Sequence, residues 1–337
     1  MKKSLSILII FALIISAFVA LTGCGGGDDA DSEKLSVCVV VAGTFGDKSF
    51  NDYAKEGVEQ LAEDKDVKVS YIECENEGIQ QKLRDAADEV DIVVAVGWRC
   101  YEIASVAPEY KDTKFIWVDN VAEGLSGIDN LLCITYAQNE GSFLAGYIAA
   151  KKSETGVIGV VGGEDSVVIN DFIKGYTQGA KYADSDIKVK KIYSNTYEDP
   201  AKGKECALEL YDKGADVIFN VAGNTGTGIF EAAQEKGFYA IGVDADQKLT
   251  HPEYDDVILC SMKKEVGLSI YEAITDYIEN DTFEGGKEVV KDIASGHISI
   301  AYGDENSAQQ VSNSLKEKVE KIQKKIVNGK IEVKSTR

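Results

Sequence analysis

The sequence predicts an α/β protein built from two doubly wound lobes, each a parallel sheet with helices on both faces. Nearly continuous runs of Val and Ile, such as 35–41 and 156–161, alternate with segments whose apolar residues have helical spacing. This alternation is typical of buried parallel strands joined by helices. The series occurs twice, and its second copy begins at Gly156. At 337 residues the chain is also longer than one hydrophobic core usually requires, which favours two domains.

The first series predicts the first lobe. Phe50, Ala54, Val58 and Leu61 occur at positions i, i+4, i+8 and i+11, so they share one face of a helix that follows the first strand. The loop between them, Gly43–Ser49, is polar, and its simplest interpretation is a turn in which Ser49 caps that helix. The predicted strands of this lobe are 35–41, 67–72, 91–96, 114–118 and 131–136, and the further helices are 79–90 and 142–152.

The second series predicts strands at 156–161, 187–193, 216–221, 239–243 and 257–260, with a charged amphipathic helix at 311–327. The strand that ends near Ser261 comes too late to belong simply to the second lobe. We therefore expect the chain to cross back to the first lobe there and to return later. This division gives 34–152 plus about 259–285 for lobe 1 and 153–258 plus about 286–337 for lobe 2, joined by a hinge with several crossings.

The N-terminus predicts export. A basic start, Met1-Lys2-Lys3, precedes an apolar stretch at 5–21, and Leu21-Thr22-Gly23-Cys24 follows. This signal resembles one that ends in a bacterial lipobox, so we expect 1–23 to be a signal peptide and Cys24 to be lipidated. Residues 24–33 would be a flexible tether, and the chain would be lipid-anchored on the extracytoplasmic face of the cell membrane. An ordinary signal peptide or an uncleaved anchor is the alternative.

Composition limits the possible partners and chemistry. The formal net charge of −21 repels nucleic acid and anionic lipid surfaces. His251 and His297 are isolated in the sequence, which gives no support to a histidine-based metal or catalytic site. The cysteines lack metal-binding spacing, and we interpret them as small buried apolar residues, with disulfides as the alternative. They are Cys38, Cys74, Cys100, Cys133, Cys206 and Cys260.

Polar residues gather where the predicted strands end. Because ligands of open α/β sheets bind at the carboxyl ends of the strands, we expect these residues to line a cleft between the lobes. Each also has a structural interpretation, as a helix cap, a core residue, a tight turn or a solvated charge. The polar and aromatic candidates are Asp47, Asn51, Trp98, Asp165, Asn224, Asp244, Asp246 and Lys264.

Motifs for catalysis are weak. The glycine-rich run 223–228 does not spell GxGxxG and lacks a Walker lysine, and Gly-x-Ser-x-Gly is absent. Asp47 and Asp244 could pair as carboxylates, but the sequence supplies no nucleophile or metal cluster to give them a reaction. We therefore expect no enzyme activity, no catalytic residues, no metal and no cofactor.

Several motifs together resemble the basic-membrane-protein family of bacterial substrate-binding lipoproteins, whose characterised members bind purine nucleosides for ABC-type importers. The resemblance runs from about Leu35 to Gly303, and the order and spacing of its motifs make it specific. The motifs are Gly46-Asp47-Lys48-Ser49-Phe50-Asn51, Glu140-Gly141-Ser142-Phe143-Leu144-Ala145-Gly146, Ala222-Gly223-Asn224-Thr225-Gly226, Gly242-Val243-Asp244-Ala245-Asp246-Gln247 and Ser261-Met262-Lys263-Lys264.

The resemblance implies a type I periplasmic-binding-protein fold that closes on its ligand. It implies that Phe50 and Tyr197 stack on the base, with Asp47 and Asn51 beside the first ring. It also implies that an aspartate and a lysine hold the ribose.

Those ribose ligands fall on Asp244 and Lys264, and the Ser-x-x-Lys spacing selects Lys264 rather than Lys263. Gly226 would approach the ribose with its backbone. Two departures, a tyrosine at Tyr197 and an indole at Trp98, affect the preferred base.

The resemblance further implies the partners: a purine nucleoside such as inosine, guanosine or adenosine, the permease and ATPase subunits of an ABC importer, and the membrane through the lipid on Cys24. We expect a monomer. The alternatives are a sensor or adhesin lipoprotein without a transport role, and an enzyme such as a nucleoside hydrolase. A repressor core is disfavoured, because the N-terminus carries a lipobox-like signal instead of a basic helix-turn-helix.

Overall fold

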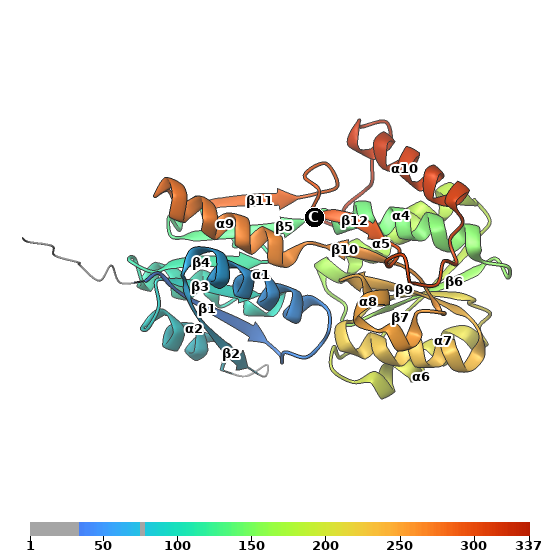
Figure 1. Ribbon diagram of the computed structural model, residues 1–337, viewed down its shortest axis with the longest axis horizontal. Coiled ribbons are helices and arrows are strands. Elements are labelled where there is room, and N and C mark those ends of the chain that lie inside the picture. Colours follow the sequence, from blue (N-terminus) through green and yellow to red (C-terminus); the bar gives the residue numbers. More distant parts are fainter. Residues whose placement is uncertain (1–33, 75–77) are drawn as a thin grey trace, which may run out of the picture. The chain divides into compact units, whose positions relative to one another are not determined.

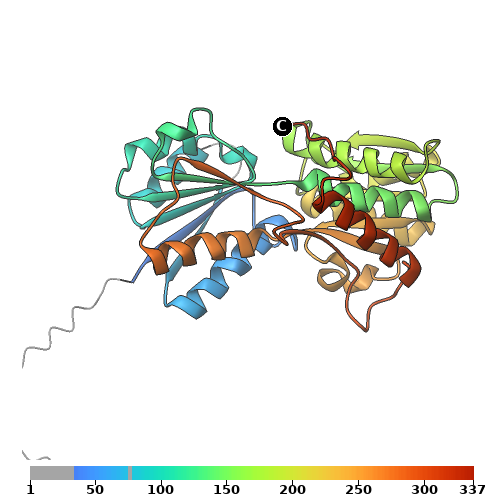
Figure 2. The ribbon, with the colours of Figure 1, turned by 90° about the horizontal axis from the view of Figure 1, so that it is seen from above.

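The computed structural model describes residues 34–74 and 78–337, and the expected signal peptide, tether and lipidated Cys24 lie outside these residues. The described chain forms two six-stranded sheets with helices on both faces (Figures 1 and 2). The strand orders are β11-β5-β4-β3-β1-β2 and β12-β10-β9-β8-β6-β7. The predicted two-lobe α/β architecture is therefore confirmed. No helix of the described ranges is long and apolar enough to span a bilayer.

The first sheet is parallel throughout, and alternate residues of its strands face different helices. Val39 packs with helices α1 and α9, whereas the next residue, Val40, packs with α2 and α3. Burial on both faces explains the unbroken Val/Ile runs. The elements are β1 (Ser36–Ala42), α1 (Phe50–Lys65), β2 (Lys68–Cys74), α2 (Ile79–Ala87), β3 (Ile92–Val96), η1 (Trp98–Cys100), α3 (Ile103–Val106), η2 (Ala107–Glu109), β4 (Lys114–Val118), η3 (Leu125–Gly127), β5 (Leu131–Tyr136), α9 (Val266–Asn280) and β11 (Lys287–Lys291).

The second sheet is parallel except for β12, which runs antiparallel to β10. Helices α4, α5 and α10 pack in one core with Val160, while α6 and α7 pack in another with Val161. Its elements are α4 (Gln138–Lys152), β6 (Val157–Gly162), α5 (Val167–Ala183), β7 (Lys188–Tyr193), α6 (Pro200–Asp212), β8 (Val217–Val221), η4 (Gly223–Gly226), α7 (Thr227–Lys236), β9 (Tyr239–Asp244), α8 (Gln247–Thr250), η5 (Pro252–Tyr254), β10 (Ile258–Lys264), β12 (Ile298–Ala301) and α10 (Asn313–Val327).

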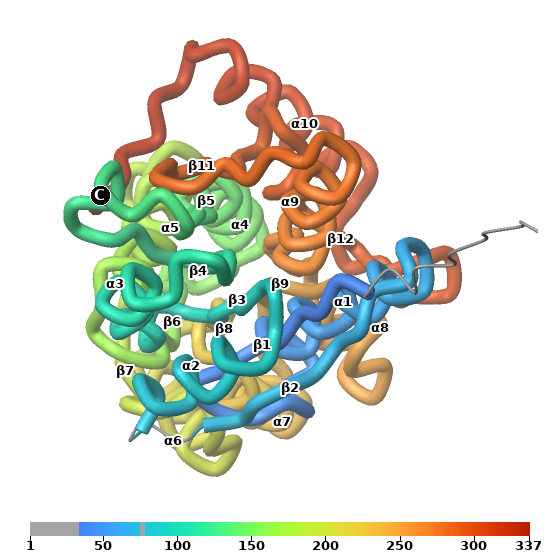
Figure 3. Tube along the Cα trace, turned by 90° about the vertical axis from the view of Figure 1, so that its left-hand side faces the viewer, coloured from blue at the N-terminus to red at the C-terminus, as the bar shows by residue number. Residues whose placement is uncertain are grey.

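The chain crosses between the sheets later than expected. Strand β10 stays in the second sheet, because it continues the parallel ladder beside β9, so residues 259–264 do not join the first lobe. The crossing comes with α9, which packs against α1 where Gly57 and Gly267 let the two backbones touch (Figure 3). Strand β11 then joins the first sheet rather than the second, and the chain returns to β12.

Helix α4 also differs from the expected division, because it packs with the second sheet although we placed 142–152 in lobe 1. It lies against α5, where Gly146 and Gly179 have no side chain between the helices: a Cβ at Gly179 would lie 1.8 Å from the carbonyl oxygen of Phe143. The crossings that follow β5, β10 and β11 together form the hinge. All six cysteines of the described chain are buried, in agreement with their interpretation as small apolar residues.

Candidate functional site

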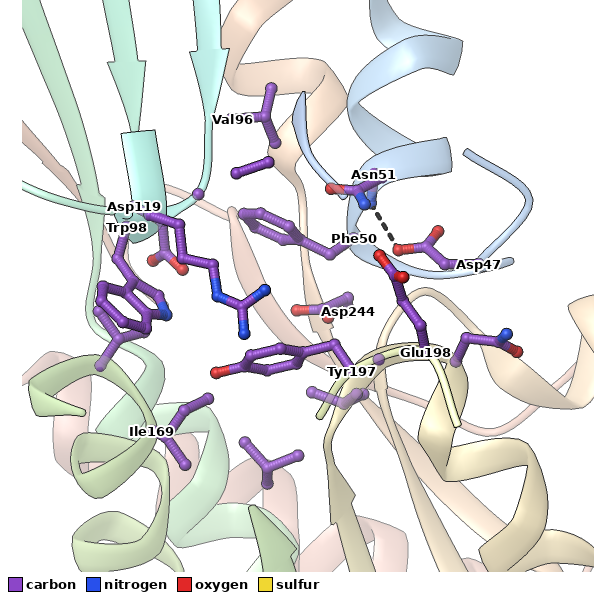
Figure 4. Close-up of a pocket in the computed structure, with 18 of the residues that line it drawn as sticks. Asp47, Phe50, Asn51, Val96, Trp98, Asp119, Ile169, Tyr197, Glu198 and Asp244 are labelled. Atoms are coloured by element: carbon purple, nitrogen blue, oxygen red, sulfur yellow. Dashed lines mark hydrogen bonds between the residues drawn. The ribbon is translucent and has the colours of Figure 1, made fainter. Parts of the chain in front are cut away.

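A pocket lies where the carboxyl ends of strands from both sheets meet (Figure 4). It encloses about 130 Å³, roughly ten times the space that one water needs, so a small molecule fits. Eight of the nine residues expected to bind ligand line it. The lining residues are Ala42, Thr44, Phe45, Gly46, Asp47, Phe50, Asn51, Val96, Gly97, Trp98, Arg99, Asp119, Val168, Ile169, Phe172, Tyr197, Glu198, Val221, Gly223, Asn224, Val243, Asp244 and Lys264.

Gly226 is the one expected residue that does not line the pocket. Gly226 is buried at the end of η4 and packs against Asn220, where a Cβ would lie 1.9 Å from Nδ2 of the asparagine. Its missing side chain serves this close approach within the fold, whereas Asn224, earlier in the same turn, reaches the pocket. Asp165 and Asp246 also lie outside the lining set; Asp165 accepts from the Asn170 amide, and Asp246 caps α8.

Lys264 is the buried cation at the centre of the site. Its ammonium nitrogen Nζ donates to Oδ2 of Asp119 at 3.0 Å and lies 3.9 Å from Oδ1 of Asp244. Three aromatic rings surround it at 4.6 to 5.2 Å from Nζ to the centroid: Phe50, Tyr136 and Phe172. Paired carboxylates and ring faces offset the cost of burying this charge.

The choice between the two adjacent lysines follows from strand geometry. Successive side chains of β10 point to opposite faces of the sheet, so Lys263 points away from the pocket. Lys263 instead pairs with Glu265 at 2.5 Å and lies over the ring of Tyr53. Of the two, the structure therefore places Lys264 in the pocket, as the spacing of its motif predicted.

Asp119 and Asp244 occupy equivalent positions in the two lobes. Asp119 directly follows the buried strand β4, Asp244 is the last residue of the buried strand β9, and each has a positive φ, 76° for Asp119 and 63° for Asp244. Such backbone costs energy for a residue with a Cβ, and it is concentrated at functional sites. In both residues the buried Oδ1 atom has no hydrogen-bond donor among the described residues. These two oxygens are available to hydroxyl groups of a ligand.

Burial dominates the acidity of Asp244. It raises the pKa of this carboxyl to about 6; Lys264 opposes the rise, whereas the nearby charges of Asp119 and Asp47 add to it. The hydroxyl of Ser49, from the other lobe, donates to Oδ2 of Asp244 at 3.2 Å. A ligand hydroxyl that donates a hydrogen bond to the remaining oxygen of Asp244 would stabilise the ionised form of this carboxyl further.

Asp47, not Ser49, satisfies the start of α1. Its carboxylate accepts the backbone N–H groups of Ser49, Asn51 and Asp52 at 2.9 to 3.1 Å, and Ser49 makes no side-chain cap. Burial outweighs these bonds and raises the pKa of Asp47 to about 6. The capping interpretation is thus correct for Asp47, although its side chain also lines the pocket.

Aromatic residues form the other part of the wall. Figure 4 shows Phe50 and Tyr197 on facing sides of the pocket, with Asp244 between them and Trp98 beside them. Phe50 is half-buried, although Ala54 and Val58 on the same helix are completely buried. Helical spacing alone assigned Phe50 to the core, but its position as the first residue of α1 turns it toward the pocket.

Tyr197 lies on the connection before α6, directly against a backbone segment. A Cβ at Gly163 would lie 2.1 Å from Cε1 of the tyrosine, so the ring touches the main chain of the loop after β6. Burial raises the pKa of Tyr197 to about 12, and the nearby Trp98 side chain opposes this rise; by geometry, the buried hydroxyl completes no hydrogen bond with the described residues. This hydroxyl is a further group that a ligand or water can satisfy.

Sequence reasoning missed Asp119, Arg99 and Glu198. Asp119 directly follows a predicted strand, as Asp244 does, so the same rule of strand ends would have found it. Arg99 follows Trp98, and its guanidinium lies over the ring of Tyr197 and pairs with Glu164. Glu198 follows Tyr197 and is exposed at the edge of the pocket.

The side-chain amides of Asn51 and Asn224 use only part of their hydrogen-bonding capacity within the protein. Nδ2 of Asn51 donates to the carbonyl of Thr44 at 2.9 Å, which turns the amide and leaves Oδ1 for a ligand donor. Oδ1 of Asn224 accepts from the Thr227 hydroxyl at 3.3 Å, which leaves its NH₂ group. Within the described ranges, no cluster of three or more His, Cys, Asp or Glu side chains fits a metal ion. The arrangement is suited to holding a polar ring compound by hydrogen bonds and stacking.

Comparisons with known proteins agree with a binding role. The family model for "ABC transporter substrate-binding protein PnrA-like" (Bmp) matches residues 34–337. The chain is 32% identical over 332 residues to Basic membrane protein A of Borreliella burgdorferi, covering 97% of this chain and 96% of the relative. It is 30% identical over 362 residues to the ABC transporter nucleoside-binding protein BmpA of Lactococcus lactis subsp. cremoris, covering 99% and 100%.

Among solved structures, a solute-binding protein of an ABC transporter system from Aeropyrum pernix has a TM-score of 0.80 and 27% identity, covering 88% of this chain and 92% of that one. This similarity confirms the type I periplasmic-binding-protein fold that the sequence resemblance implied.

Proposed function

The chain belongs to the Bmp family of PnrA-like ABC transporter substrate-binding proteins, and we propose that it binds a purine nucleoside between its two lobes. The observation that carries this proposal is the pair of buried aspartates, Asp119 and Asp244, whose free oxygens lie beside the ammonium of Lys264. Ribose offers adjacent hydroxyl groups, which donate to carboxylates and accept from an ammonium.

The aromatic wall supports the base. Phe50 is only partly buried and lines the pocket, and a stacked aromatic pair contributes roughly 0.5–1.5 kcal/mol beyond the area that it buries. Asn51 and Asn224 each keep one amide group for the polar edge of the base or for the ribose. The name of the Lactococcus relative, a nucleoside-binding protein, supports the same ligand class.

The cellular role in this proposal is delivery of the nucleoside to the permease and ATPase of an importer. Lipid attached to Cys24 would hold the protein at the extracytoplasmic face of the membrane, through the tether at 24–33. A sensor lipoprotein without a transport role is the alternative, and the gene neighbourhood tests it: genes for a permease and an ATPase beside this gene would favour transport. A nucleoside hydrolase would release free base from inosine or guanosine, so absence of release excludes that activity for these substrates.

A thermal-shift screen tests the ligand class. A ligand that binds only the folded protein stabilises it by RT ln(1 + [L]/Kd), about 2.7 kcal/mol at one hundred times Kd. We expect purine nucleosides to raise the melting temperature and monosaccharides to leave it unchanged. A shift produced by a sugar or a peptide, with none from any nucleoside, overturns the proposal.

A further inference from the structure

The guanidinium of Arg99 occupies part of the aromatic surface in the pocket. Its Cζ atom lies 4.9 Å from the ring centroid of Tyr197 and 6.0 Å from that of Trp98. The Tyr197 ring is backed by the main chain of Gly163, so it has little freedom to turn away. A base bound in the pocket therefore shares the Tyr197 side with a guanidinium.

Glu164 holds Arg99 in this position. The two side chains form an ion pair, and they come from different sheets, because Arg99 follows β3 and Glu164 follows β6. Their side chains are only 20% and 25% exposed, so solvent screens the pair less than it screens a surface ion pair. The ion pair thus spans the two lobes at the pocket and fixes where the guanidinium lies.

A guanidinium offers only hydrogen-bond donors. Among the described residues that line the pocket, Arg99 and Lys264 are the two cations, and Lys264 is already engaged with Asp119. The proposed function uses Lys264 for the ribose. Arg99 donates to Glu164 through Nη2 and keeps further N–H donors, so it is the cation that can contact the edge of a base. Atoms O6 and N7 of guanine accept in the geometry of a guanidinium, as they do in hypoxanthine, whereas adenine carries an amino donor at position 6.

We infer that Arg99 determines specificity in the proposed nucleoside site and favours 6-oxopurine nucleosides over adenosine. The inference rests on the proposed function, since it concerns the same pocket. Glu164 is a positioning residue in this scheme, because it acts by orienting the guanidinium.

Calorimetric titration of the full chain with four ligands tests this inference: inosine, guanosine, adenosine and purine riboside, which has neither an oxygen nor an amino group at C6. We expect inosine and guanosine to bind roughly tenfold more tightly than adenosine. Purine riboside should bind more weakly than inosine and more tightly than adenosine. In Arg99→Ala the affinities for inosine and adenosine should become equal. Arg84→Ala is the matched control, because Arg84 pairs with Glu109 at 2.8 Å on the protein surface, outside the pocket lining.

Two further variants separate specificity from stability. Arg99→Met keeps an apolar contact to Tyr197 without donors, so it should also lose the preference and serves if the alanine variant does not fold. Glu164→Gln should reduce the ratio of inosine affinity to adenosine affinity, while inosine still binds. Equal affinities in the wild type, or an unchanged ratio in both Arg99 variants, overturn the inference. A wild type that binds none of the four nucleosides overturns the proposed function itself.

Discussion

Lys264 and Asp119 form an ion pair between the two lobes, with 3.0 Å from Nζ to Oδ2, although they are 145 residues apart in the chain. Lys264 ends β10 of the second sheet and Asp119 follows β4 of the first. Lys264 also lies 3.9 Å from Asp244, so one cation serves two buried carboxylates. The same contacts therefore link closure of the lobes to the proposed ribose site.

Removal of this cation should destabilise the fold. Lys264→Met leaves Asp119 and Asp244 buried without a counter-charge, and breaking a buried pair in this way costs about 3–5 kcal/mol. The loss should appear in urea unfolding of the ligand-free protein. Lys263→Met is the control, because Lys263 pairs with Glu265 outside the pocket lining. The double variant Lys264→Met, Asp119→Asn should recover part of the loss; equal effects of the two single lysine variants contradict this account.

Truncation of Asp244 should remove the proposed ligand contact. Asp244→Ala deletes a buried acceptor with a free oxygen, and hydrogen bonds to charged groups contribute about 1.5–3 kcal/mol each. With two ribose hydroxyls affected, we expect inosine affinity to fall at least a hundredfold by calorimetry. Asp85→Ala, which changes an exposed carboxylate on α2, should bind normally. Full affinity in Asp244→Ala would remove the ribose assignment.

The same aspartate should make stability depend on pH. Its folded pKa is raised to about 6 from the usual 3.8, so the favourable contribution of its protonated form is complete below pH 4 and is lost as pH rises through 6. An asparagine side chain does not ionise, so the variant Asp244→Asn keeps this contribution to stability as pH rises. The ligand-free variant should therefore gain stability relative to the wild type between pH 4 and pH 7, as measured by urea unfolding. A difference that stays constant over this range contradicts the raised pKa.

Gly163 should matter for binding through Tyr197. In Gly163→Ala the new Cβ would lie 2.1 Å from the tyrosine ring, which must shift, and overpacking of this kind costs about 1–3 kcal/mol. We expect inosine affinity to fall roughly tenfold if the ring contacts the base. Gly127→Ala is the control, because a Cβ there meets no atom within 4 Å among the described residues. Unchanged affinity in Gly163→Ala would exclude Tyr197 from the binding surface.

Local pattern in the sequence was sufficient for the parallel strands, because each carries a long Val/Ile run. It was insufficient for β11 and β12, which are short and partly exposed, and for the side of the hinge on which β10 lies. Sheet membership depends on which neighbour a strand pairs with, and spacing along the chain does not encode that choice.

In the candidate site, too, some residues could be predicted from local sequence and others could not. Position at a strand end indicated Asp244, and resemblance singled out Lys264. The same rule of strand ends applies to Asp119, which was overlooked, whereas Arg99 was missed because its role depends on its contact with Glu164 across the lobes. Gly226, which was expected at the ligand, lies outside the pocket lining and packs against Asn220. A glycine in a tight turn lets another group approach the backbone closely, and only the structure shows whether that group is a ligand or a side chain of the protein.

Binding of a purine nucleoside between the lobes is tested most directly by calorimetric titration of the purified full chain with inosine and guanosine. We expect saturable binding of at least one of them at one site per chain, and loss of that binding in Asp244→Ala. Absence of binding heat with every purine nucleoside, together with saturable binding of a ligand that has no ribose, would contradict it.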